Sequence, residues 1–107
     1  MSQADTESPI LNDLSAKMRC GIFTNSQGEI LIIHDKIIEG SIDYVEFDSQ
    51  EQSFFLIYDD GRMQALGIEF NAQIQSNLQH GTEVTLAFIQ NKAIQSSEKV
   101  VFLIRDL

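Results

Sequence analysis

The stretch that decides the fold is residues 42–67, IDYVEFDSQEQSFFLIYDDGRMQALG. Apolar and polar side chains alternate through much of it, which is typical of β-strands that bury one face. Two turn segments interrupt the alternation. Asp60-Gly61 is typical of the two-residue type I′ turn, in which both central residues have a positive φ angle. The polar segment 49–52 is the other turn. The stretch therefore predicts three antiparallel strands joined by two hairpins.

Each predicted turn sets the register of its hairpin. The loop at 49–52 places Phe47 opposite Phe54, and a two-residue turn at 60–61 places Tyr58 opposite Met63. With both registers, one face of the sheet is continuously apolar, and it carries Val45, Phe47, Phe54, Leu56, Tyr58, Met63 and Ala65. Because two independent hairpins place apolar residues on the same side, their registers support each other.

The opposite face of these strands mixes apolar and polar side chains. Tyr44 and Phe55 are too apolar for open water, whereas Glu46 is too polar for a dry core. One interpretation is a helix that covers the apolar centre. The other is a groove or subunit interface, in which a polar rim surrounds an apolar centre. The residues we take as the candidate interface are Tyr44, Phe55, Ile57, Arg62, Gln64 and Leu66.

The rest of the chain predicts more strands and two short helices. Strands are expected at 22–24, 29–34, 83–90 and 100–104, and the run 30–33 is apolar on both faces, as in an interior strand. Ser8-Pro9 and Gly21 bound one expected helix, and a second is expected near 71–80, before Gly81. Residues 1–7 are expected to be a disordered acidic tail and 8–107 a single domain. The predicted class is α+β, with a curved, mainly antiparallel sheet or half-open barrel of about seven strands.

Composition and charge limit the possible roles. The chain has 107 residues, and its formal net charge is −9. Segment 29–60 holds nine acidic residues and one basic residue, a net charge of −8. An acidic segment of this kind repels phosphate backbones and anionic lipids when it lies at the surface. We therefore expect neither a nucleic acid nor a membrane as partner. Since we find no secretory signal and only one cysteine, Cys20, we expect a cytoplasmic protein.

Few residues suggest chemistry. His34 and His80 are the only histidines, and no spacing of His, Cys or acidic residues is typical of a metal site. The chain lacks a Gly-x-Ser-x-Gly elbow and a phosphate-binding glycine loop. We therefore assign no catalytic residue, no metal and no cofactor. The polar groups most suited to a small-ligand pocket are His34, Tyr58 and His80, together with Arg62.

Three functional hypotheses follow. The first is a non-catalytic interaction module that forms a homodimer or binds a protein partner through the mixed face. The second is a small-ligand-binding protein or minor enzyme with a pocket under the curved sheet. The third is an acidic decoy of nucleic acid, which the charge of segment 29–60 favours weakly.

Overall fold

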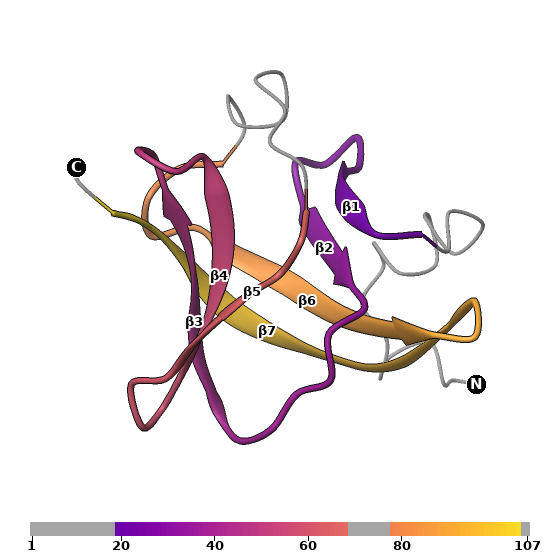
Figure 1. Cartoon of the computed structure of the whole chain (residues 1–107). Helices are drawn as coiled ribbons and strands as arrows, with labels where there is room; N and C mark the ends of the chain where they lie inside the picture. Colours follow the sequence, from indigo (N-terminus) through magenta and orange to yellow (C-terminus); the bar gives the residue numbers. More distant parts are fainter. Residues whose placement is uncertain (1–18, 69–77, 106–107) are drawn as a thin grey trace.

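The computed structural model describes residues 19–68 and 78–105, which form one seven-stranded sheet (Figure 1). In chain order the strands are β1 (Gly21–Thr24), β2 (Ile30–His34), β3 (Ile42–Asp48), β4 (Ser53–Tyr58), β5 (Met63–Ala65), β6 (Glu83–Gln90) and β7 (Ala93–Arg105). Their order across the sheet is β1-β2-β6-β7-β3-β4-β5. The β6–β7 hairpin is thus inserted between β2 and β3, although these two strands follow each other in the chain.

The expected α+β class is wrong for the described residues, which are all-β. Two of the strand pairs, β2–β6 and β3–β7, are parallel, so the sheet is mixed. Short loops predict antiparallel neighbours, but the 35–41 connection carries the chain past two strand positions. The expected tail at 1–7, the helix from Ser8 and most of the helix near 71–80 lie outside the described residues. Residues 78–80 are described and are not helical.

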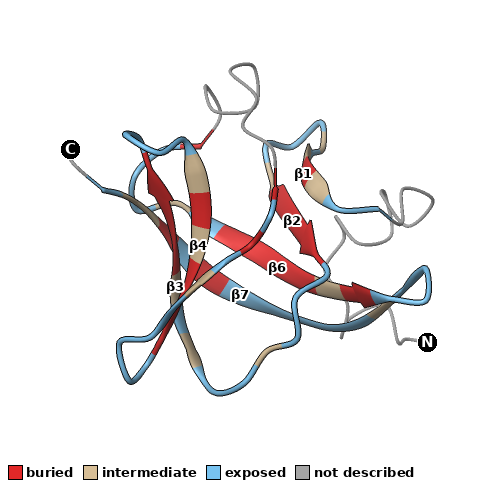
Figure 2. Cartoon of the chain, in the orientation of Figure 1, coloured by how far each residue is buried: buried red, intermediate tan, exposed pale blue. Residues whose placement is uncertain are grey.

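The sheet curls around one core on its inner face (Figure 2). All seven strands or their flanking residues contribute to this core, because alternate residues of each strand point to the same side. The largest members are the aromatic residues of β3, β4 and β7. The core cluster contains Ile22, Ile30, Ile32, Val45, Phe47, Phe54, Leu56, Tyr58, Leu66, Ile68, Leu78, Val84, Leu86, Val100 and Phe102.

Strand β2 is buried on both faces, as the apolar run 30–33 predicts. Every residue of Ile30–His34 is buried, and β2 lies between β1 and β6. A second cluster occupies the outer face here and contains Leu31, Ile33, Ala87 and Ile89. The interior position of this strand is therefore confirmed.

The β3–β4 hairpin has the predicted register. Phe47 is opposite Phe54, and Val45 is opposite Leu56. The two phenylalanine rings are tilted against each other with centroids 4.9 Å apart, which is a favourable geometry for an aromatic pair. In the connecting loop, Oδ1 of Asp48 accepts hydrogen bonds from the backbone N–H of Gln50 at 2.9 Å and of Glu51 at 3.2 Å.

The β4–β5 hairpin differs from its prediction by one residue. Tyr58 pairs with Arg62 through a backbone hydrogen bond of 2.9 Å from its N–H, and Ile57 is opposite Met63. The loop therefore has three residues, Asp59 to Gly61, and Gly61 has φ of +92°. A three-residue loop that ends in a left-handed glycine is the next most common hairpin connection. Because side chains alternate, this shift of one residue exchanges the two faces of β5.

The type I′ turn occurs at a different place. Asn91 and Lys92 have φ angles of +55° and +62°, and Gln90 pairs with Ala93 across them. The sequence predicts only a polar connection over 91–97, because Asn-Lys lacks the glycine typical of this turn. As a result, β7 begins at Ala93 and is longer than the expected strand 100–104.

Replacement of Lys92 by glycine should stabilise the fold. A left-handed conformation costs a residue with a Cβ atom about 1–2 kcal/mol, whereas the extra entropy of glycine in the unfolded chain costs about 0.5–1 kcal/mol. We expect Lys92→Gly to raise the free energy of unfolding by up to about 1 kcal/mol in urea denaturation. Lys92→Ala keeps the Cβ atom and is the control, for which no gain is expected. Equal stabilisation by both variants would contradict the turn assignment.

Candidate interaction face

The outer face of strands β7, β3, β4 and β5 carries side chains in rows that cross the sheet. In the first row, Val101, Tyr44, Ile57 and Met63 lie directly opposite one another on four successive strands. We call these four residues the apolar row. Its two ends are the most open, since Val101 is 42% exposed and Met63 45% exposed. Tyr44 is half-buried and Ile57 is buried. The row is apolar along its whole length, and most of its solvent-exposed apolar surface lies at its two ends.

The next two rows become progressively more polar. The second row places Leu103, Glu46, Phe55 and Ala65 opposite one another. The third row places Arg105, Asp48 and Ser53 together. The outer face is thus graded from an apolar end to a charged end.

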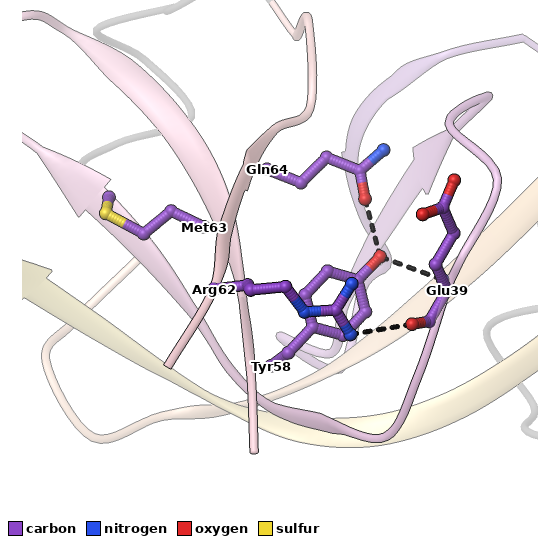
Figure 3. Close-up of a pocket in the computed structure, with 5 residues that line it drawn as sticks. All are labelled: Glu39, Tyr58, Arg62, Met63 and Gln64. Atoms are coloured by element: carbon purple, nitrogen blue, oxygen red, sulfur yellow. Dashed lines mark hydrogen bonds between the residues drawn. The ribbon is translucent and has the colours of Figure 1, made fainter. Parts of the chain in front are cut away.

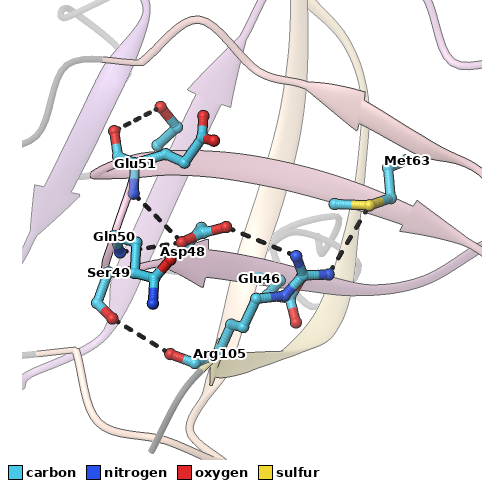
Figure 4. A network of polar contacts seen from close by, with 8 residues as sticks. Glu46, Asp48, Ser49, Gln50, Glu51, Met63 and Arg105 are labelled. Atoms are coloured by element: carbon cyan, nitrogen blue, oxygen red, sulfur yellow. Dashed lines mark hydrogen bonds and ion pairs between the residues drawn. The ribbon is translucent and has the colours of Figure 1, made fainter.

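One guanidinium crosses the charged end of the face (Figure 4). Arg105 comes within 3.2 Å of Oε1 of Glu46 and within 3.6 Å of Oδ2 of Asp48, and its Nη2 lies 3.8 Å from Sδ of Met63. Both carboxylate side chains are only 11% exposed, whereas the Arg105 side chain is 43% exposed. Oε1 of Glu46 is buried and accepts no hydrogen bond. Arg105 therefore compensates these buried charges through ion-pair contacts alone.

Three of the six predicted interface residues lie on this face: Tyr44, Phe55 and Ile57. Leu66 is 1% exposed and belongs to the inner core. Arg62 and Gln64 lie on the opposite side of the sheet, since Gln64 is opposite Leu56. The one-residue difference in hairpin register accounts for all three displacements.

Four apolar residues of the face were absent from the prediction: Met63, Ala65, Val101 and Leu103. The prediction also lacked Asp48, Ser53 and Arg105 of the third row. A three-residue loop ending at Gly61 would have placed Met63 and Ala65 correctly. For Val101 and Leu103 the sequence predicts a strand that is apolar on both faces. Their position beside β3 depends on a parallel pairing between distant segments, for which the local sequence carries no signature.

The displaced residues Arg62 and Gln64 hold the 35–41 connection against the β4–β5 hairpin (Figure 3). The Tyr58 hydroxyl donates a hydrogen bond of 2.5 Å to Oε1 of Gln64 and accepts one of 3.0 Å from the Glu39 N–H. The Arg62 guanidinium lies 4.4 Å from the Tyr58 ring centroid and donates to the Glu39 carbonyl at 2.7 Å. These groups form a clamp, Tyr58–Arg62–Gln64, on the connection.

A shallow cavity of about 330 Å³ lies beside the clamp and is lined by Glu39, Tyr58, Arg62, Met63 and Gln64. Its polar groups are largely used within the protein, because Nε of Arg62 also donates to Asp60 at 2.8 Å. Gly40 fits closely beneath the guanidinium, since a Cβ atom at this position would come within 2.7 Å of Nη2 of Arg62. The arrangement is therefore suited to fixing the connection rather than to catalysis.

The structure does not bring the predicted pocket residues together, since His34 and His80 do not line the cavity beside Tyr58. His34 is fully buried, and its Nδ1 accepts a hydrogen bond of 3.2 Å from the Lys36 N–H. Its Nε2 is buried without a hydrogen-bond partner. Burial lowers the pKa of His34, and the neighbouring Asp35 carboxylate opposes part of this shift. His80 is exposed, and its Nδ1 accepts a hydrogen bond of 2.9 Å from the Ile104 N–H.

Cys20 is not activated as a nucleophile. It lines a second shallow cavity of about 340 Å³ with Arg19, Asp35 and Lys92. Burial and the Asp35 carboxylate raise the pKa of the Cys20 thiol, so the reactive thiolate is disfavoured. Among the described residues, no group of three or more His, Cys, Asp or Glu side chains is placed to hold a metal ion.

Comparison of the chain with models of protein families, with curated proteins and with solved structures found no match. Within residues 19–68 and 78–105, no helix has the length and apolar character needed to span a membrane.

Removal of the Tyr58 hydroxyl should destabilise the fold. Tyr58→Phe leaves the Glu39 N–H and the Gln64 side chain without their partner, so we expect the free energy of unfolding to fall by about 1–3 kcal/mol. Tyr44→Phe is the matched control, because no hydrogen bond joins the Tyr44 hydroxyl to another described residue. We expect its effect to stay within about 0.5 kcal/mol. Equal effects in thermal or urea denaturation would show that the clamp contributes nothing.

Acidification should weaken the fold through His34. Because its folded pKa lies below its ordinary value, the unfolded chain binds more protons as the pH falls below about 6.5. Stability is thus retained above this value and lost below it. His34→Asn keeps an acceptor for the Lys36 N–H but does not titrate. We expect the decrease in melting temperature between about pH 7 and pH 5 to be smaller in this variant. An unchanged decrease would contradict the role of His34.

Proposed function

We propose that the chain is a non-catalytic interaction module that forms a homodimer through the outer face of β7, β3, β4 and β5. The observation that carries this proposal is the apolar row, which ends in two large exposed side chains, Val101 and Met63. Apolar side chains with charged groups at the edge of the surface are typical of interfaces between proteins, and here Arg105, Glu46 and Asp48 form the charged end of the face. Sheet-on-sheet packing of two such faces removes the apolar row from water.

Charge favours a second copy as the partner on this face. The three rows contain two acidic residues, Glu46 and Asp48, and one basic residue, Arg105, so their net charge is −1 in a chain of net charge −9. Two identical acidic chains repel each other least where such near-neutral faces meet. A two-fold axis also lets the same patch act on both chains. The face therefore fits a homodimer better than a strongly basic partner.

The proposal also includes the cellular setting and the excluded partners. We propose a cytoplasmic protein, consistent with its single, unactivated cysteine. The excess of acidic residues supports the exclusion of nucleic acids and anionic membranes as direct partners. A small-ligand function receives less support, because the polar groups of the Tyr58 cavity already bind the 35–41 connection.

A lysine in the apolar row should weaken self-association. Val101→Lys puts an ammonium group in the contact between two copies, where it loses water without gaining a partner. We expect the dimer dissociation constant to rise by at least about tenfold, equivalent to about 1.4 kcal/mol. Sedimentation equilibrium across a concentration series measures this constant, and the wild-type mass should approach twice 12.1 kDa.

Ile37→Lys is the matched control for this experiment. Ile37 is 60% exposed and lies in the 35–41 connection, where its carbonyl accepts a hydrogen bond of 3.4 Å from Gln64, a residue on the opposite side of β5 from Met63. The two variants change the charge equally, so their difference reports the position of the interface. A wild-type chain that remains at 12.1 kDa at all concentrations, or equal weakening by both variants, would refute the proposed dimer.

A further inference from the structure

The ion pairs at the charged end of the outer face are incomplete within one chain. Two carboxylates, Glu46 and Asp48, share the single guanidinium of Arg105. The shorter contact is 3.2 Å and the longer is 3.6 Å, and buried Oε1 of Glu46 accepts no hydrogen bond. Guanidinium and carboxylate groups normally form bidentate hydrogen bonds when their geometry permits. Here the shared cation is bound to neither carboxylate in that way.

The two sides of this contact differ in how firmly they are held. Asp48 uses Oδ1 to accept two backbone hydrogen bonds in the β3–β4 loop, so its position is set by the fold. Arg105 is the last residue of β7, and its side chain is 43% exposed. Its remaining contact, to Sδ of Met63 at 3.8 Å, is weak. The guanidinium is therefore the movable partner, and it borders the apolar row.

We propose that, in the homodimer, Arg105 of each copy binds Glu46 and Asp48 of the other copy. The inference rests on the proposed dimer and identifies the groups that set its specificity. Since a two-fold interface is reciprocal, one exchange creates two equivalent contacts. Packing of the two apolar rows removes water from the carboxylates, which strengthens their attraction for a guanidinium and penalises any unpaired charge. Arg105 is thus a specificity-determining residue of the contact.

A charge-exchange experiment tests this assignment. The first variant, Arg105→Glu, retains both carboxylates but loses the cation. The second, Glu46→Lys, retains Arg105 but loses one carboxylate. In a homodimer of either variant, the exchanged contact brings like charges together. Two carboxylates face a third in Arg105→Glu, and a guanidinium faces an ammonium group in Glu46→Lys. We therefore expect the dissociation constant of each homodimer to rise at least about tenfold. In an equimolar mixture, the first chain offers Glu46 and Asp48 to the second chain's Arg105. In the same heterodimer, the ammonium group introduced by Glu46→Lys lies opposite the carboxylate introduced by Arg105→Glu.

We therefore expect the mixture to form a heterodimer, detected by native mass spectrometry with one chain isotopically labelled. The melting temperature of each variant, measured alone, establishes that it is folded. If Arg105 acts only within its own chain, the Arg105→Glu chain gains no more from mixing with Glu46→Lys than from mixing with Val101→Lys, and that result would overturn the exchange. The dimer itself is tested separately, by the association of the wild-type chain and its weakening in Val101→Lys. If the wild-type chain dimerises but the mixture forms no heterodimer, the dimer stands and only the exchange of Arg105 is refuted. Matched mixing of Arg105→Glu with Val101→Lys is the control and should give no heterodimer.

Discussion

The loop of Asp59, Asp60 and Gly61 is the constraint on which the described structure depends most. Its glycine has a φ angle of +92°, and the Tyr58 N–H closes the hairpin on the Arg62 carbonyl. A three-residue loop fixes which side chains of β5 point inward. Leu66 then completes the inner core, and Met63 completes the apolar row on the outer face. One residue fewer in the loop would exchange these positions and put a leucine in water and a methionine against the core.

The same register keeps the polar side chains of β5 on the inner side of the sheet, apart from the charged residues of the outer face. Arg62 and Gln64 face the side from which the 35–41 connection approaches, where they join Tyr58 in holding its backbone. This connection needs such support because it links β2 to β3 across two intervening strand positions and cannot use a tight turn. The outer face contains a different polar group, Arg105 with Glu46 and Asp48, at one end of an otherwise apolar surface. The inner face is thus closed by the chain itself, whereas the outer face is the one through which we propose that two copies associate.

Local patterns predicted the parts of the fold that local physics determines. The register of Phe47 against Phe54 and the interior position of β2 both follow from alternation and turn position, and both are confirmed. The hairpin at Gly61 was wrong by one residue because Asp-Gly suits two kinds of turn, and the choice between them depends on packing. The parallel pairs β2–β6 and β3–β7 join segments distant in sequence, so no local pattern specifies them. Because of the hairpin shift, three of the six predicted interface residues, Arg62, Gln64 and Leu66, lie on the inner side of the sheet.

The hairpin register can be measured directly in solution by nuclear Overhauser effects between α-protons. The hydrogen bond between Tyr58 and Arg62 makes Ile57 and Met63 a non-hydrogen-bonded pair, in which the two Cα atoms approach to about 4.5 Å. The three-residue loop predicts a strong effect between the α-protons of Ile57 and Met63. A strong effect between those of Tyr58 and Met63 would instead indicate a two-residue turn. That result would remove Met63 from the outer face and contradict the apolar row.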